Sequence, residues 1–177
     1  MENNGARLEF MKRDESASAG ASSANASAST STGSASASAT AATGDVVTTS
    51  LTSDSNFKEK RELQTYVVAD DDIARIETVA VFVDTDDDPG FIFWLTNKTD
   101  KELYFTNADG VFTVNGKQAD PILSEDVAPG QTLETAMWFD HRELDSSKID
   151  DFVNVKGQLE VWDGETLETL ASYDFKF

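Results

Sequence analysis

The sequence predicts an all-β protein, an antiparallel β-sandwich that follows a disordered tail rich in Ser and Ala. Three observations lead to this prediction. From residue 63 onward, short runs of aromatic and β-branched residues alternate with turn-forming residues. No stretch shows the alternation of strands and helices that builds a parallel sheet. Residues 16–44, by contrast, contain only Ser, Ala, Thr, Gly and one Asn.

The Ser/Ala tract, residues 16–44, is expected to have no fixed structure. It carries no charged, aromatic or branched aliphatic side chain, so it cannot bury enough apolar surface to offset its conformational entropy. Its alanines favour a helix, but the interspersed Ser, Thr and Gly oppose one, and no apolar stripe is present to dock it. We therefore expect residues 1–44 to form a flexible linker or stalk, 45–62 a transition segment, and 63–177 the folded domain.

Five short apolar runs predict strands in the first half of the domain. Each is rich in aromatic or β-branched residues and ends at turn-forming residues. The last run is followed by Asn115 and Gly116, the strongest short hairpin signal, because both residues tolerate a positive φ. The predicted strands are LQTYVVA (63–69), IARIETVAVFVD (73–84), GFIFWLTN (90–97), ELYFT (102–106) and VFTV (111–114).

Three further strands and one helix are expected in the second half. Pro129 and Gly130 mark a tight turn. The strands that follow are LETAMWFD (133–140) and a closing hairpin of VKGQLEVWDG (155–164) and TLASYDFKF (169–177). Residues 141–151 predict one short connecting helix anchored by Leu144 and Ile149. A small closed barrel is the alternative to the sandwich.

Alternation along the strands predicts which side chains build the core. Residues that recur at every second position share one face of a strand. The predicted core residues are Phe91, Phe93, Leu95, Met137, Phe139, Leu159, Val161, Tyr173 and Phe175.

The order of these features resembles an uncharacterised family of immunoglobulin-like domains on secreted lipoproteins of Gram-positive bacteria. The resemblance covers residues 64–177, and its most specific parts are TNKTDKELYF and VNGK. It implies an immunoglobulin-like sandwich outside the cytoplasm, in which Asn97, Thr99 and Asp100 shape the turn after the central strand. The family offers no known catalytic residues to transfer to this chain, and the lipid-bearing Cys is missing here.

Charge and cysteine content exclude several classes of partner and chemistry. Residues 45–177 contain 29 acids and only 11 Lys or Arg, a net charge of −18. Such a domain repels phosphate backbones and anionic headgroups, so we expect neither nucleic acid nor direct membrane insertion. The chain has no Cys, which excludes disulfides, thiolate catalysis and Cys-ligated zinc.

The N-terminal sequence bears on location. No apolar run approaches the roughly 20 residues that cross a bilayer, and residues 1–16 lack the apolar core of a secretory signal. A Ser/Ala-rich tether before a β domain is typical of surface proteins whose signal has been removed. We therefore expect an extracellular or cell-surface protein, with the export signal absent from this sequence.

The three tryptophans are the candidate ligand-binding residues. Trp94, Trp138 and Trp162 each occupy the strand phase opposite to the predicted core, so each should point outward. On neighbouring strands they would form an aromatic surface able to stack on sugar rings or anchor a protein. The alternatives are that the tail before residue 63 or a long loop covers them, or that the opposite phase is the true core.

An acidic turn is the candidate metal site. In DTDDDPG, Asp84, Asp86 and Asp88 recur at every second position, as at the start of a calcium loop. Pro89 stands where that loop has its sixth-position Gly, and Leu95 where it has a bidentate Glu. A solvated turn without calcium is the alternative.

No catalytic motif accompanies the single histidine. His141 lies beside Asp140 and four residues before Asp145, but no nucleophile or phosphate-binding loop is identifiable with it. We interpret it as a surface residue that begins a short helix, and we expect no enzyme activity.

Two functions remain. One is a binding or adhesion module for a protein or glycan at the cell envelope, and the other is a structural accessory or spacer domain of an envelope assembly.

Overall fold

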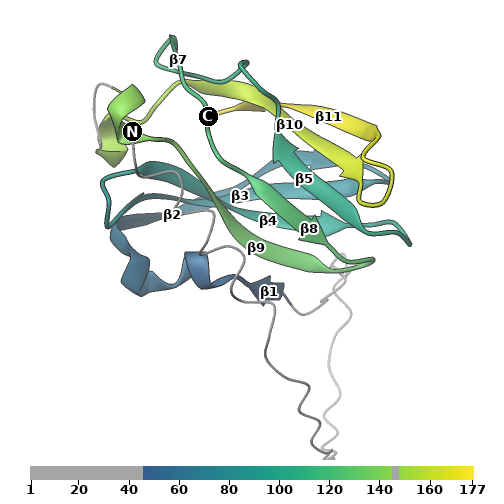
Figure 1. Cartoon of the computed structure of the whole chain (residues 1–177). Helices are drawn as coiled ribbons and strands as arrows, with labels where there is room; N and C mark the ends of the chain where they lie inside the picture. Colours follow the sequence, from purple (N-terminus) through teal and green to yellow (C-terminus); the bar gives the residue numbers. More distant parts are fainter. Residues whose placement is uncertain (1–45, 145–147) are drawn as a thin grey trace, which may run out of the picture. The chain divides into compact units, whose positions relative to one another are not determined.

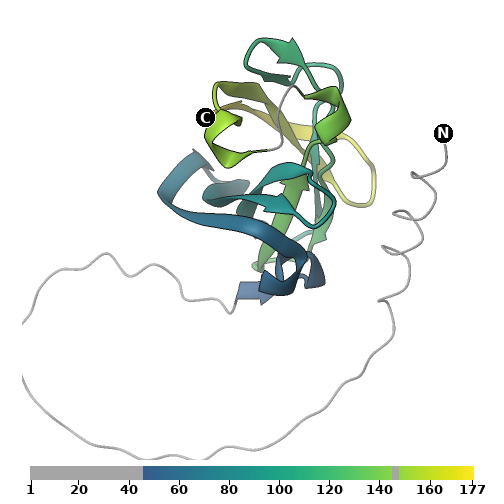
Figure 2. The ribbon, with the colours of Figure 1, turned by 90° about the vertical axis from the view of Figure 1, so that its left-hand side faces the viewer.

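The computed structural model describes residues 46–144 and 148–177. Within these ranges the chain is mostly β and forms two sheets, sheet A and sheet B, stacked as separate layers (Figures 1 and 2). This confirms the all-β, two-sheet character that the sequence predicts. The predicted stalk, residues 1–44, lies outside the described residues.

Sheet A contains five strands in the order β1-β9-β4-β3-β2. Neighbouring strands run antiparallel, except that β1 lies parallel to β9. The strands are β1 (Val46–Thr48), β2 (Phe57–Asp70), β3 (Ala74–Asp84), β4 (Pro89–Asn97) and β9 (Thr132–Trp138).

Sheet B contains six strands with β10 at its centre. β10 pairs antiparallel with β5, β6 and β11, while β8 pairs with β5 and β7 with β6. The strands are β5 (Leu103–Asn107), β6 (Thr113–Val114), β7 (Lys117–Gln118), β8 (Ser124–Val127), β10 (Val155–Asp163) and β11 (Thr169–Lys176).

The core lies between the inner faces of the two sheets. All nine predicted core residues belong to it or pack against it: eight are buried, and Tyr173 is half-buried at its margin. Phe175 of sheet B meets Phe91 and Phe93 of sheet A, with ring centroids 5.2 and 5.7 Å apart. The strand faces expected from alternation are therefore confirmed.

A second apolar cluster lies on the outer face of sheet A. It is built around Phe82, Ile92 and Trp138, and Leu51 and Phe57 pack against it. Both belong to residues 46–57, which we call the N-terminal strap. The strap contains β1, which is the edge strand of sheet A beside β9, and two 3-10 turns, η1 (Ser50–Thr52) and η2 (Asp54–Asn56). The two turns lie beneath sheet A in Figures 1 and 2. The sandwich therefore extends into residues 46–62, which were expected to be a transition segment.

Two turns form as their residues predict. Asn115 and Gly116 join β6 to β7 with positive φ values of 54° and 83°. Gly130 has φ 68°, and the amide of Gln131 donates to the carbonyl of Ala128 at 3.1 Å. Residues that tolerate the left-handed region thus set both reversals.

Asn97 organises the turn between β4 and β5. Its buried side chain accepts hydrogen bonds from the backbone N and the hydroxyl of Thr99, both at 2.8 Å. Its amide group donates to the carbonyls of Lys101 and Val127, at 2.7 and 2.8 Å. Because one buried side chain satisfies several backbone groups, it stabilises the turn and ties it to β8.

The prediction of a helix over residues 141–151 is wrong for the described residues. Two single 3-10 turns occur instead, η3 (His141–Glu143) and η4 (Ile149–Asp151), while Leu144 and Lys148 are extended. Ile149 is buried and Leu144 packs against the core, so both anchors point inward as expected. Their separation of five residues does not match a helical repeat of three or four, which explains the interruption. Residues 145–147 lie outside the described part.

Candidate functional site

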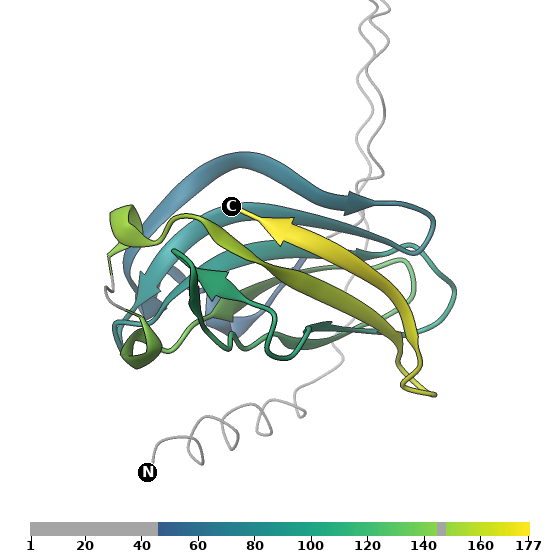
Figure 3. The same ribbon diagram turned by 90° about the horizontal axis from the view of Figure 1, so that it is seen from above.

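The outer face of sheet B carries the candidate site. In β10, Leu159 and Val161 are buried in the core, whereas Glu160 and Trp162 alternate with them and are half-buried on the outside. Figure 3 views this face from above, with β10 and β11 in front of the other layer. The side chains that alternate with the core therefore form one outward surface.

Trp162 and Tyr104 form an aromatic pair on this face. They stand opposite each other on β10 and β5, with ring centroids 5.9 Å apart and an interplanar angle of 56°. Trp162 Nε1 donates to Glu160 Oε2 at 3.0 Å, and the hydroxyls of Tyr104 and Ser124 share a hydrogen bond of 2.8 Å. Both rings are therefore held by polar contacts while part of each stays exposed.

Carboxylates surround the aromatic pair. Asp126 of β8 is directly opposite Tyr104, and Glu102 precedes Tyr104 by two residues; both are exposed. Opposite residues on one face have Cβ atoms about 5 Å apart, and residues i and i+2 of a strand are about 7 Å apart. We call this surface the Trp162 platform, formed by Glu102, Tyr104, Asp126, Glu160 and Trp162.

A buried acid supports the loop next to the platform. Asp163 follows Trp162 and is 5% exposed; its Oδ1 accepts from the backbone N of Thr166 at 2.9 Å and of Glu165 at 3.0 Å. Lys101 Nζ donates to its Oδ2 at 3.1 Å. These contacts, led by the Thr166 amide, lower the pKa of Asp163 to about 2. The acid therefore stays charged and fixes the β10–β11 loop.

The opposite end of the same face differs in charge. Lys156 and Lys176 stand directly opposite each other on β10 and β11. With Val111 and Asp174 they line a shallow hollow of about 270 Å³. The outer face of sheet B thus has an acidic, aromatic end and a basic end.

The other two tryptophans lie on sheet A. Trp94 is half-buried, and its Nε1 donates to Glu134 Oε2 at 2.7 Å; Trp138 is 7% exposed within the cluster under the strap. All three indoles point outward from the core, as expected. The prediction that the three tryptophans form a single aromatic surface is wrong, because β4 and β9 belong to sheet A and β10 to sheet B. Alternation indicates which face of a strand a residue occupies, but not which sheet the strand joins.

The acidic turn does not gather its three predicted calcium ligands. Asp84 Oδ1 accepts from the backbone N of Asp86 and of Asp88, both at 2.9 Å, and so shapes the turn itself. The side chain of Asp88 is 5% exposed and turns toward His141. In the described part of the chain, the group of possible metal ligands contains Asp88 with Asp140 and His141. The described structure therefore brings Asp88 together with Asp140 and His141 and not with Asp84 and Asp86, and the calcium site at this turn stays a prediction.

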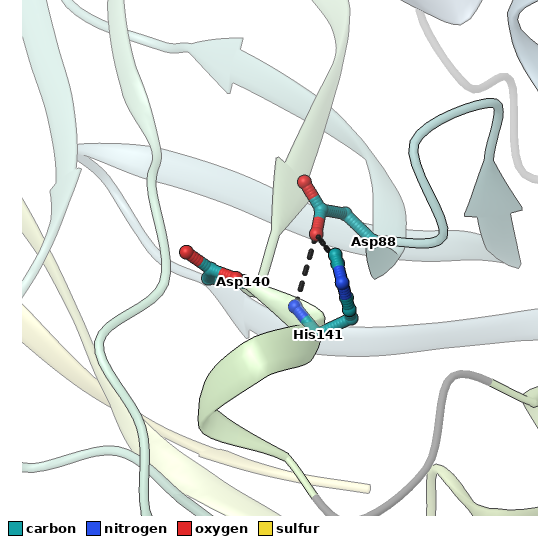
Figure 4. Close-up of side chains that lie close together, drawn as sticks. All are labelled: Asp88, Asp140 and His141. Atoms are coloured by element: carbon teal, nitrogen blue, oxygen red, sulfur yellow. Dashed lines mark hydrogen bonds and ion pairs between the residues drawn. The ribbon is translucent and has the colours of Figure 1, made fainter. Parts of the chain in front are cut away.

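Figure 4 shows the cluster that forms instead. Asp88 Oδ1 accepts from the backbone N of His141 at 2.9 Å and lies 2.9 Å from its Nδ1. Asp140 accepts from the backbone and guanidinium of Arg142, and the Arg142 side chain is the main cause that lowers the pKa of Asp140 to about 2.

This cluster fits a structural role better than a metal site. One ligand atom from each of Asp88, Asp140 and His141 lies within 4.8 Å of the others, and two carboxylates with an imidazole are a donor set that zinc or manganese accepts. A metal would compete with Arg142 for Asp140 and with the backbone N of His141 for Asp88. We interpret the cluster as a structural contact that holds η3 against the β3–β4 turn.

Sequence reasoning missed most of the Trp162 platform. Tyr104, Asp126 and Glu160 come together through the pairing of β8, β5 and β10, and the sequence does not state which strands pair. The available signal was alternation in ELYFT, where buried Leu103 and Phe105 place Tyr104 on the outer face.

The described residues define a two-sheet β-protein with an acidic aromatic surface on the outer face of sheet B. No family model, curated protein or solved structure matches the chain. Among the described residues, no helix has the length and apolar character of a membrane span.

Proposed function

We propose that residues 46–177 form a non-catalytic binding module that presents the outer face of sheet B to a protein or glycan partner. One observation carries this proposal. Trp162 and Tyr104 stay partly exposed on the outer face of sheet B, whereas the strap packs on the apolar outer face of sheet A. Partly exposed aromatic side chains are typical anchors of binding surfaces.

The order of the strands supports an immunoglobulin-like module. In that fold, one sheet contains strands A, B, E and D and the other contains G, F and C. Here β3-β4-β9 corresponds to A-B-E, and β11-β10-β5 corresponds to G-F-C, with β8 in the place of an added C′ strand. β1 takes the position of D, although it runs parallel to β9.

The proposed location is outside the cytoplasm, with the module carried on residues 1–44 as a stalk. The resemblance of residues 64–177 to domains of secreted lipoproteins supports this location. The net charge of −18 on residues 45–177 supports a partner other than nucleic acid or an anionic membrane.

A structural spacer is the second candidate function. The observation that favours it is the strap, which packs on the apolar outer face of sheet A around Trp138, itself only 7% exposed. A spacer, however, has no need for a partly exposed Trp162 with three carboxylates around it.

A comparison of three full-length proteins tests the binding function. The wild type, Trp162→Ala and Tyr66→Ala are immobilised and exposed to an extract of the cell envelope. Tyr66 is an aromatic residue on β2 that is 44% exposed and lies outside the platform, so it controls for the loss of any exposed ring. We expect a bound component that the wild type and Tyr66→Ala retain and Trp162→Ala loses. Identical sets of bound components on all three proteins would favour the spacer.

A further inference from the structure

We propose that the Trp162 platform binds a cationic group, so that its partner presents a segment bearing Lys or Arg. This inference rests on the proposed binding function and adds the chemistry of the partner. It names one occupant, a basic peptide segment, in place of the wider choice of protein or glycan.

Within residues 46–144 and 148–177, no Lys or Arg forms an ion pair with a carboxylate of the platform. Those Lys and Arg side chains of the described residues that form ion pairs do so with other acids. Lys101, which is next to Glu102 in sequence, pairs with Asp163 at 3.1 Å. None of those ion pairs involves Glu102, Asp126 or Glu160. Three acids therefore surround one aromatic pair without a counter-ion from the described chain.

The aromatic pair favours a cation in the same place. A Lys or Arg head group is attracted to the face of an indole or phenol ring, and the attraction grows as water is removed. Glu160 accepts the hydrogen bond of Trp162 Nε1 at 3.0 Å, which places a carboxylate beside the indole. A guanidinium or ammonium over the rings can then pair with this acid or with Asp126 across from Tyr104.

The charge of the whole domain acts in the same direction. With 29 acids against 11 Lys or Arg in residues 45–177, the surrounding field attracts basic partners and repels acidic ones. Lys156 and Lys176 lie at the other end of the face. The platform is therefore the acidic end of a polarised surface, and a basic segment has one preferred end on which to bind.

Matched variants separate the platform from the general charge of the domain. Full-length protein is titrated with an acetylated peptide in which Lys residues are spaced by Gly and Ser, and binding is followed by calorimetry. The double variant Glu160→Gln, Asp126→Asn removes two charges from the platform and keeps the shape of both side chains. The control Asp72→Asn, Asp86→Asn removes two exposed charges from loops outside it.

We expect the platform variant to weaken peptide binding by roughly tenfold, as the loss of charge-assisted contacts implies, and the control by less than about twofold. Trp162→Ala should weaken peptide binding by roughly five- to tenfold. Thermal unfolding of this variant is measured as well, to show that it is folded. Equal losses in the platform and control variants, or a peptide that does not bind at all, would overturn the inference.

A neutral oligomer of N-acetylglucosamine serves as the second probe. If it binds in a Trp162-dependent way while the Lys peptide does not, the cationic partner is wrong and the binding function stands. If neither probe binds, the cationic partner is also wrong, and the extract comparison with Trp162→Ala and Tyr66→Ala decides the binding function independently.

Discussion

Truncation of the aromatic contact between the two sheets is expected to remove a large part of the stability of the domain. Phe93 of β4 and Phe175 of β11 are both 0% exposed, and their rings meet edge to face at 5.7 Å and 66°. Replacing a fully buried Phe by Ala costs about 3–5 kcal/mol, from lost burial and from the cavity left behind. Phe175 also meets Phe91 at 5.2 Å and Phe112 at 6.3 Å, so Phe175→Ala should lie near the upper end of that range.

Urea unfolding followed by circular dichroism measures both costs. Tyr66→Ala is the control, because Tyr66 is 44% exposed and a surface substitution should stay within about 0.5 kcal/mol. The free energies of unfolding of the two Phe variants are compared with that of the wild type, on the condition that all three transitions have the same slope against urea concentration. Losses below about 1 kcal/mol at both Phe positions would show that these rings do not join the sheets, and the assignment of the strand faces would be wrong.

Three further expectations concern single polar groups. The buried hydroxyl of Thr78 has no hydrogen-bond partner among the described residues, so Thr78→Val should raise the free energy of unfolding by about 1 kcal/mol in thermal or urea unfolding. Burial raises the pKa of Glu125 above its ordinary 4.5. The folded state therefore favours the neutral form of Glu125, and the free energy of unfolding falls as the pH rises through the raised pKa. Glu125→Gln should be more stable than the wild type at neutral pH but not at acid pH. The pKa of Asp163 is lowered from 3.8 to about 2, first by the Thr166 amide, so its contribution is present above about pH 4 and lost as the pH falls toward 2. Asp163→Asn should lack that loss in unfolding curves measured over the same acid range.

Strands with apolar alternation could be predicted from the sequence, and strands without it could not. β3, β4, β9, β10 and β11 follow runs of aromatic and branched residues and were expected nearly at their bounds. β8 reads SEDV, and the first half of β2 reads FKEKRE. Such charged edge strands form because a neighbour supplies hydrogen bonds, and local sequence does not record that neighbour.

The candidate site likewise contains features that could be predicted from the sequence and features that could not. The outward phase of Trp162 follows from the buried residues on either side of it, so it was predictable. The separation of Trp162 from Trp138 was not, because β9 and β10 are consecutive strands that join different sheets. Asp88 meets His141 across 53 residues, and a carboxylate-rich turn offers no local sign of that distant partner.

Acrylamide quenching of single-tryptophan proteins tests most directly whether the outer face of sheet B is more open than that of sheet A. One full-length variant keeps only Trp162, through Trp94→Phe and Trp138→Phe. A second keeps only Trp138, through Trp94→Phe and Trp162→Phe. We expect the quencher to reach Trp162 readily and Trp138 poorly, since Trp138 is 7% exposed beneath the strap. Equal shielding of the two indoles would contradict an open binding face on sheet B and leave the spacer as the better function.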